Sequence, residues 1–331
     1  MLTQPSQSTD QDTCPTASAE QLLAFCKASA DQLRLDILRI LSRDSFAVSE
    51  LCKIVDYKQS GLSHHLKILA TAGLVTTRRE GNTIFYRRAT ATSQPSLEAL
   101  QQQLFVAIDR LPLPTHTEQR LQDLQQDRAK RSQAFFTSNA DRFRQQQEQI
   151  AAYELYGSHA AELVINNTSA GATVLEVGPG EGAFLSALSG HFKQVYALDN
   201  SQAMLDIAKQ QVEQQQLSNV QLLHGDTKNA ALRKLQLDCI VINMVLHHTP
   251  SPAEIFSDLG ALLNKDGQLF VTDLCRHDQS WVQDACGDLW LGFEPEDLSD
   301  WAASAGLVEA QSIYLTQLNG FRVQIRQFLK Q

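Results

Sequence analysis

Residues 174–182 read VLEVGPGEG, and this stretch decides the fold of the larger part of the chain. An apolar run ends there in alternating glycines, Gly178, Gly180 and Gly182, and a second apolar run begins at about residue 183. This pattern predicts a strand, a tight turn and a helix, because glycine adopts positive φ angles and leaves no Cβ between the backbone and a ligand. The first N–H groups of the helix would face that ligand. The glycines also satisfy the loose dinucleotide pattern, so a nicotinamide cofactor is a second interpretation.

Apolar segments alternate with helical patterns from residue 172 onward. The predicted strands are 173–177, 194–198, 220–224, 239–242 and 268–273. This alternation predicts a doubly wound, Rossmann-like α/β sheet, whose ligands bind at the carboxyl ends of the strands. Two later runs, 306–315 and 321–329, flank an Asn-Gly pair and predict a terminal antiparallel hairpin. Such a hairpin is not expected of nicotinamide-binding folds, so the nicotinamide interpretation becomes the weaker one.

Three carboxylates lie at the ends of the first three predicted strands. Asp199 comes directly after the second strand and can accept hydrogen bonds from both hydroxyls of a ribose. Asp226 follows the third strand and can accept a bond from an adenine amine, while Glu176, beside the glycines, can hold an ammonium group. A ligand that combines ribose, adenine and an amino group is S-adenosylmethionine, because a nicotinamide cofactor has no primary ammonium.

Composition separates a small basic segment from an acidic remainder. The 331 residues contain 28 Lys and Arg against 37 Asp and Glu, for a formal net charge of -9. Residues 58–88 nevertheless hold six basic residues and one acidic residue, a local charge of +5 that leaves -14 for the rest. This asymmetry predicts one basic module on an acidic body.

The cysteines and the N-terminus bear on compartment and processing. The six cysteines contain no C-x-x-C or C-x-C pattern, which predicts neither a disulfide framework nor a metal site and fits a cytoplasmic protein. No apolar run approaches the roughly 20 residues of a membrane span. Residues 1–18 lack a basic and an apolar signal region, so we expect a disordered tail.

Residues 48–88 have the pattern of a winged helix-turn-helix. Two short helical segments, 48–55 and 59–71, are joined by a tight turn, and the second carries polar side chains on its leading face. Two strands, 74–79 and 83–88, follow around Gly81 and carry arginines on both arms. A helix of this kind meets base edges in a DNA groove, and arginines pair with phosphates.

The strings SADQLRLDILRILS, SELC and QSGLSHHLKILATAGLVTTRREGNTIFYRR, over residues 20–90, closely resemble the ArsR/SmtB family of winged-helix regulators. The metal-sensing members of that family usually carry C-x-C near the position of Cys52, which here stands alone, so metal sensing is not expected. The resemblance implies double-stranded operator DNA as the partner and assigns DNA contacts to nine residues: Gln59, Ser60, Ser63, His64, Lys67, Arg78, Arg79, Asn82 and Arg87.

Helical patterns connect the two parts. Residues 97–111 carry an apolar stripe on which two chains can pair into a homodimer, since palindromic half-sites require two-fold symmetry; packing within its own domain is the alternative. Residues 118–165 are glutamine-rich and contain spaced aromatics, and RSQAFFTSNADRF resembles the cap helices of small-molecule methyltransferases. We expect four segments along the chain: a tail at 1–18, a DNA-binding and dimerisation domain at 19–111, a helical linker and cap at 112–165, and the Rossmann-like α/β domain at 166–331.

The strings VLEVGPGEG, ALDNSQAMLDIAK, HGD, DCIVINMVLHH and GQLFVTDL resemble, in order and spacing, the class I S-adenosylmethionine-dependent methyltransferases. The resemblance covers about residues 130–330 and implies a methyl transfer to an unidentified acceptor. It implies that the cofactor, or S-adenosylhomocysteine as an effector, is bound by Glu176, Gly178, Gly180, Gly182, Asp199, Asn200, Met204, Asp226, Thr227 and Asn243.

Two histidines and a set of aromatic residues are candidates for the acceptor side. His247 or His248 can supply a general base, although packing and hydrogen bonding are the favoured explanation for histidines there. The candidate acceptor pocket comprises Asp273, His277, Trp281, Trp290 and Phe293, with core packing as the alternative for the tryptophans. Two functions follow: a DNA-binding regulator that senses the cofactor or its demethylated product, or a small-molecule methyltransferase that regulates its own gene.

Overall fold

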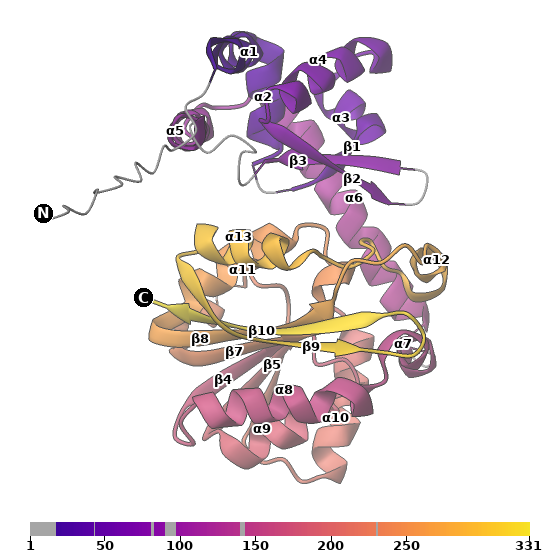
Figure 1. Cartoon of the computed structure of the whole chain (residues 1–331). Coiled ribbons are helices and arrows are strands. Elements are labelled where there is room, and N and C mark those ends of the chain that lie inside the picture. Colours follow the sequence, from indigo (N-terminus) through magenta and orange to yellow (C-terminus); the bar gives the residue numbers. More distant parts are fainter. Residues whose placement is uncertain (1–17, 43, 81–82, 90–96, 140–142, 230) are drawn as a thin grey trace, which may run out of the picture. The chain divides into compact units, whose positions relative to one another are not determined.

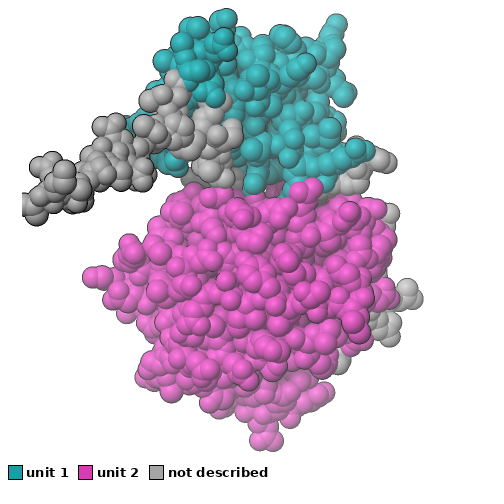
Figure 2. All heavy atoms as spheres, in the orientation of Figure 1, with its two compact units in different colours: residues 1–79, 83–121 teal, residues 80–82, 122–331 magenta. Residues whose placement is uncertain are grey.

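The structure is a computed structural model, and it describes residues 18–42, 44–80, 83–89, 97–139, 143–229 and 231–331. The chain divides into two compact units (Figure 2). Unit 1 comprises residues 1–79 and 83–121, and unit 2 comprises 80–82 and 122–331. The division falls inside a helix, whereas the sequence placed the end of the DNA-binding domain at residue 111. The predicted tail lies almost wholly outside the described residues.

Unit 1 is mostly helical and contains a small sheet (Figure 1). Its three-stranded sheet has the order β1-β3-β2, so the predicted wing hairpin gains a third strand. Phe46 of that short strand pairs with Tyr86 of the wing. The elements are α1 (Ala19–Ser29), α2 (Gln32–Ile40), β1 (Phe46–Ala47), α3 (Val48–Val55), α4 (Gln59–Thr71), β2 (Val75–Glu80), β3 (Thr83–Arg88) and α5 (Glu98–Asp109).

The apolar spacing of α4 explains how this helix is held. Leu62, Leu66 and Leu69 recur at helical spacing and are completely buried, which fixes one face of α4 in the core of unit 1. The turn before the helix contains Asp56 with φ of +52°, a left-handed conformation that lets the chain reverse after α3. The opposite face of α4 is therefore left to solvent.

A buried arginine ties the wing to α5. Arg88, at the end of β3, is 8% exposed, and its two terminal nitrogens bond the Asp109 carboxylate at 2.7 and 3.0 Å. Its Nε donates to the carbonyl oxygen of Leu38 at 2.6 Å. The last strand of the wing, α2 and α5 are therefore joined through one side chain.

Unit 2 is a doubly wound α/β fold, as the sequence predicts. Its seven-stranded sheet has the order β6-β5-β4-β7-β8-β10-β9; β4 to β8 are mutually parallel, and β10 is antiparallel to both of its neighbours. Figure 1 shows α11 and α13 on one face and α8, α9 and α10 on the other. The strands are β4 (Thr173–Val177), β5 (Gln194–Asp199), β6 (Val220–His224), β7 (Leu237–Asn243), β8 (Leu263–Leu274), β9 (Leu307–Thr316) and β10 (Arg322–Lys330).

The helices of unit 2 include three that precede the sheet. The predicted helical stretch 118–165 consists of α6 (Thr115–Asn139), whose first residues belong to unit 1, α7 (Phe143–Ala151) and α8 (Tyr153–Asn167). The helix after the glycine turn begins at residue 185 rather than 183. The remaining helices are α9 (Leu185–His191), α10 (Gln202–Gln214), η3 (Leu232–Lys234), η4 (Leu246–His248), α11 (Pro252–Leu262), α12 (Trp281–Cys286) and α13 (Pro295–Ser304).

The strand order reverses between β4 and β7, because β5 and β6 extend the sheet to one side and β8 extends it to the other. Ligands of doubly wound sheets bind at such a switch point, outside the carboxyl ends of the strands. Within the part of the chain that the structure describes, no helix has both the length and the apolar character needed to cross a membrane.

Candidate functional site

The glycine turn after β4 has the backbone geometry that the sequence predicts. The φ angles of Gly178, Gly180 and Gly182 are +69°, +56° and +85°, all in the region that favours glycine. A Cβ at Gly178 would lie 2.4 Å from a side-chain carbon of Val245, so the turn also passes close to the loop after β7. Any residue other than glycine is therefore excluded at position 178, because both the backbone conformation and the lack of space oppose a Cβ there.

Glu176 is a buried carboxylate at the switch point. It lies near the end of β4, is 1% exposed, and its Oε2 has no hydrogen-bond partner among the described residues. Burial raises the pKa of Glu176 to about 8, although the neighbouring Asn243 amide lowers it in part. A carboxylate in this state favours a cationic partner.

Asp199 ends β5, next to the glycine turn. Its Oδ1 accepts a bond from the backbone N–H of Ser201 at 2.8 Å, which fixes the carboxylate at the start of α10. Burial raises the pKa of Asp199 to about 6, against the lowering effect of backbone N–H donors at Ser201 and Asn200. The side chain therefore presents an oriented acceptor.

A cavity of about 460 Å³ opens at these strand ends, within the size range of small-molecule sites. Of the ten residues predicted to bind the cofactor, all but Gly182 line it. Gly182 is buried, and a Cβ there would meet Leu185 at 3.2 Å, so it packs against α9. The nine that line the cavity are Glu176, Gly178, Gly180, Asp199, Asn200, Met204, Asp226, Thr227 and Asn243.

Helices α6, α7 and α8 supply the other wall of the cavity. Phe136 of α6 and Tyr153 and Tyr156 of α8 line it. Burial raises the pKa of Tyr153 to about 12, so its hydroxyl keeps its proton and can donate a hydrogen bond. The resemblance to cap helices had placed this stretch over the cofactor, but spacing did not identify the polar members Ser132, Gln147, Glu148 and Glu154.

The five residues predicted for the acceptor pocket are not among the described residues that line this cavity. Asp273 is fully buried and contacts the ring of His247. Phe293 is 1% exposed, and its ring packs edge-on against that of Trp301. Trp290 is also buried, and its Nε1 donates to the carbonyl oxygen of Thr249 at 2.7 Å. His277 packs edge-on against Phe321, and Trp281 is 39% exposed.

The two candidate catalytic histidines lie side by side in η4 but differ in access. His248 lines the cavity, whereas His247 is fully buried and its Nδ1 lies 2.7 Å from Oδ1 of Asp273. Burial alone would lower the pKa of His247, but the carboxylates of Asp273 and Asp288 outweigh burial and raise it to about 9. Burial, and then the charge of His247, lower the pKa of His248 well below its ordinary value. Only His248 therefore combines access to the cavity with a neutral ring.

The exposed face of α4 carries the residues predicted to contact DNA. Gln59, Ser60, Ser63, His64 and Lys67 are all exposed. On the wing, Arg79 is exposed, while Arg78 and Arg87 are half-buried. Nε of Arg87 lies 3.3 Å from the Thr76 hydroxyl across the hairpin. Asn82, the remaining predicted contact, lies outside the described residues.

These observations define the class of protein: a winged helix-turn-helix followed by a Rossmann-like domain with a cavity at its switch point. Residues 140–313 match the family of the methyltransferase domain, and residues 31–77 match the bacterial regulatory proteins of the arsR family. The first match spans more than half of the chain, so the chain belongs to the methyltransferase domain family and carries an arsR-type DNA-binding domain at its start.

Three known proteins are similar to parts of this chain. The ubiquinone biosynthesis O-methyltransferase of Coxiella burnetii is 29% identical over 153 residues, 42% of this chain and 65% of its own length. The chain thus spans less than two thirds of that relative. The transcriptional activator HlyU of Vibrio cholerae is 35% identical over 83 residues, 25% of this chain and 77% of HlyU. The magnesium protoporphyrin IX methyltransferase of Synechocystis PCC 6803, solved with bound SAH, is 19% identical with a TM-score of 0.48, covering 60% of this chain and 97% of that one.

Proposed function

We propose that unit 2 binds S-adenosylmethionine or S-adenosylhomocysteine. The observation that carries this proposal is Glu176, a buried carboxylate in the cavity wall; one of its oxygens has no hydrogen-bond partner in the part of the chain that the structure describes. Either ligand has an ammonium group that a carboxylate can hold. Asp199 accepts the ribose hydroxyls, and Asp226 or the neighbouring Thr227 meets the adenine end. The sulfonium of S-adenosylmethionine supplies the methyl group when this cofactor is bound.

Unit 1 binds double-stranded operator DNA as a homodimer in this proposal, and the protein works in the cytoplasm. The exposed polar face of α4 would enter the major groove, and Arg78, Arg79 and Arg87 would pair with phosphates along the wing. The exposed apolar residues of the predicted stripe, Leu100 of α5 and Leu111 just beyond its end, would pair with a second copy. Two copies then meet the two halves of a palindromic site.

The two binding events are coupled through ligand sensing. Helix α6 carries contacts in each unit: Arg120 bonds Asp56, at the end of α3, at 3.1 Å, while Ser132 and Phe136 line the cavity. Each contact lies within one unit, and α6 is the helix whose residues belong partly to unit 1 and partly to unit 2. A ligand that favours one conformation of α6 would therefore change the population of the DNA-competent form.

The decisive experiment measures both binding events on the full chain. Calorimetric titration with S-adenosylmethionine and with S-adenosylhomocysteine tests the cavity, and operator affinity is then measured with and without each ligand. We expect binding of at least one ligand and a several-fold change in operator affinity, within the 5–150-fold range that is typical of allosteric coupling. Equal operator affinities in all three conditions would rule out sensing, and absence of heat and of thermal shift would rule out the ligand.

The second candidate function is methyl transfer to a small molecule, with the DNA-binding domain acting on the chain's own gene. It is favoured by His248, a neutral ring in the cavity wall, and by the aromatic side chains of the cap. The relative from Coxiella burnetii is named as an O-methyltransferase of ubiquinone biosynthesis, which makes hydroxylated aromatic compounds the first acceptors to test. Release of S-adenosylhomocysteine during incubation with such compounds would support this function. Its absence across the panel, with intact cofactor binding, would count against it.

A further inference from the structure

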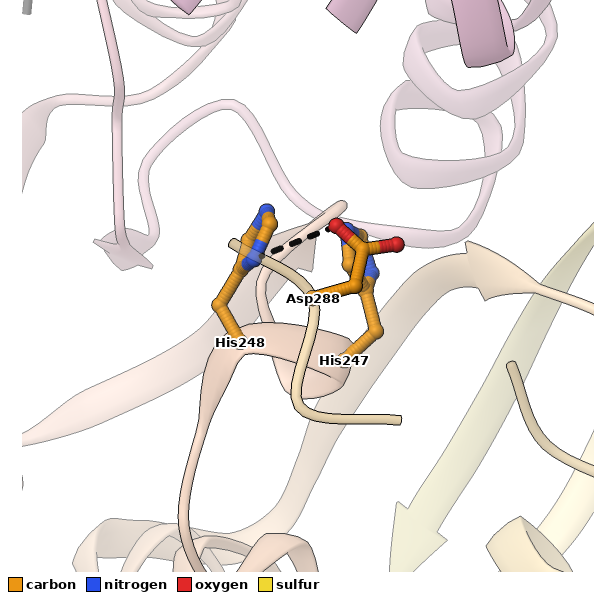
Figure 3. A group of neighbouring side chains, drawn as sticks. All are labelled: His247, His248 and Asp288. Atoms are coloured by element: carbon orange, nitrogen blue, oxygen red, sulfur yellow. Dashed lines mark ion pairs between the residues drawn. The ribbon is translucent and has the colours of Figure 1, made fainter. Parts of the chain in front are cut away.

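A buried group of two imidazoles and a carboxylate adjoins the cavity. His247 and His248 come from η4, and Asp288 comes from the loop that follows α12 (Figure 3). These residues are 0%, 5% and 3% exposed, and each offers one ligand atom within 4.8 Å of the others. The two imidazole rings lie side by side, with centroids 4.0 Å apart, and the dashed line in Figure 3 joins the Asp288 carboxylate to Nδ1 of His248 at 3.6 Å.

Asp273 fixes the orientation of the first imidazole. Its Oδ1 lies 2.7 Å from Nδ1 of His247, and both its oxygens accept backbone N–H bonds, from Leu274 at 2.8 Å and from Leu246 at 2.9 Å. The other ring nitrogen of His247, Nε2, is buried and has no hydrogen-bond partner within the described ranges. A carboxylate that bonds the far nitrogen of a histidine is the usual outer partner of a metal-ligating imidazole.

Asp288 is a buried carboxylate that lies against the two imidazoles. Its side chain is fully buried, and neither of its oxygens accepts a hydrogen bond from any residue that the structure describes. Burying a carboxylate in this way is costly unless a cation or donors compensate it. The neighbouring backbone holds it in place, because the N–H groups of Leu289 and Trp290 both donate to the carbonyl oxygen of His247, at 2.9 and 3.1 Å.

We propose that His247, His248 and Asp288 bind one divalent transition-metal ion of the zinc type. Two imidazoles and one carboxylate form a donor set of catalytic zinc sites and of non-haem iron sites, whereas magnesium and calcium prefer oxygen ligands. Ligand atoms around tetrahedral zinc lie about 3.3 Å apart, as follows from bond lengths of about 2.0 Å. The separation of 3.6 Å between His248 and Asp288 is already close to that value.

The site is distinct from the groups assigned to the cofactor. Neither His247 nor Asp288 lines the cavity among its described residues, and His248 alone belongs to both. The ion therefore occupies the wall of the cavity on the side of η4, where an open coordination position can accept an oxygen atom of a bound compound. The proposal stands whether or not S-adenosylmethionine binds.

The test measures metal content and metal affinity of the full chain, without a histidine tag. We expect about one zinc, iron or cobalt ion per chain by elemental analysis, and Co²⁺ added to the metal-free protein should give tetrahedral d–d absorption without thiolate charge-transfer bands. His247→Gln and Asp288→Asn should each weaken Co²⁺ binding more than tenfold. His191→Gln is the matched control. It changes a half-buried histidine at the end of α9 that bonds Thr168, and this variant should bind Co²⁺ as the wild type does.

Asp273→Asn keeps the three ligands and removes the charge that orients His247. We expect about 10–100-fold weaker Co²⁺ binding, the usual effect of an outer-partner mutation. Circular dichroism establishes that each variant is folded. Co²⁺ affinities of folded His247→Gln, Asp288→Asn and Asp273→Asn equal to that of wild type would overturn the proposal, as would thiolate charge-transfer bands in place of nitrogen and oxygen ligation. Separate titration with S-adenosylhomocysteine shows whether the cofactor proposal fails independently.

Discussion

The carboxyl group of Glu176 makes ligand binding depend on pH. Burial raises its pKa to about 8, so below that pH the group is protonated and must lose its proton to hold an ammonium group. We expect the affinity for S-adenosylhomocysteine to rise about tenfold per pH unit from pH 6 to near pH 8 and then to level off. Calorimetry at several pH values, in buffers with different ionisation enthalpies, measures the affinity and the proton release together.

The matched variant is Glu176→Gln, which keeps the shape of the side chain and removes its titration. Its affinity should be lower at pH 8 and nearly constant over the same range. The stability of the ligand-free protein changes in the opposite direction: the folded pKa exceeds the ordinary value, so the contribution of the protonated group is lost as pH rises from about 4.5 through 8. Thermal shifts caused by the ligand should therefore grow with pH, and a wild-type shift that is flat with pH contradicts this role of Glu176.

Gly178 tests the glycine turn with a single methyl group. In Gly178→Ala the new Cβ would lie 2.4 Å from Val245 at a φ of +69°, so both space and backbone conformation oppose it. We expect a loss of about 1–3 kcal/mol in stability of unit 2 and a strong loss of ligand heat. Gly190→Ala is the control, because a Cβ at this position in α9 meets nothing within 4 Å. It should be neutral or stabilising by up to about 1 kcal/mol, and equal losses in both variants would contradict the argument.

At the scale of elements, the pair of Arg88 and Asp109 holds the wing against α5. Asp109→Ala leaves the 8% exposed guanidinium with the carbonyl oxygen of Leu38 and the ring of Phe105, which costs about 1–3 kcal/mol after discounting for the 44% exposure of Asp109. Hydrogen exchange of the β3 amides, followed by mass spectrometry, should speed up accordingly. Glu213→Ala removes an exposed helical pair with Lys209 and should change stability by less than about 0.5 kcal/mol. Unchanged exchange in β3 would show that the pair does not secure the wing.

Elements with strong local patterns could be predicted from the sequence, and elements defined by distant partners could not. The range 59–71 coincides with α4, because its leucine spacing specifies a helix with one buried face. β1 was not predicted, since two residues form a strand only by pairing with β3. The expectation of no metal site rested on cysteine patterns and spacing, whereas the cluster at His247 is completed by Asp288 from a distant loop. Nine of the ten residues predicted for the cofactor line the cavity, and they could be identified because they follow strand ends. The cavity residues of the cap could not, because they depend on how α6 to α8 pack.

At the scale of the whole molecule, the exposed apolar face of α5 tests the homodimer. Leu100 of α5 and Leu111, just beyond the end of this helix, belong to the predicted apolar stripe and are 42% and 47% exposed. Leu100→Glu with Leu111→Glu should shift the protein to monomers in light scattering. Operator affinity should fall more than tenfold, because each monomer then meets only one half-site. Leu318→Glu, at a fully exposed hairpin position, is the control and should change neither quantity. A dimer that survives the double substitution would assign pairing to another surface.

Coupling between operator and ligand must be reciprocal if the chain is a sensor. A ligand that changes operator affinity by some factor requires the operator to change ligand affinity by the same factor. We therefore expect calorimetric titration of S-adenosylhomocysteine into the protein–operator complex to give an affinity shifted by the factor measured for the operator.

Lys67→Ala, on the exposed face of α4, should weaken operator binding while leaving ligand affinity of the free protein unchanged. Arg120→Ala removes the bond of α6 to Asp56 and should reduce the coupling factor with both separate affinities retained. Factors that differ between the two directions would mean that the two measurements do not report one equilibrium, and a factor of one in both directions would leave methyl transfer as the function of unit 2.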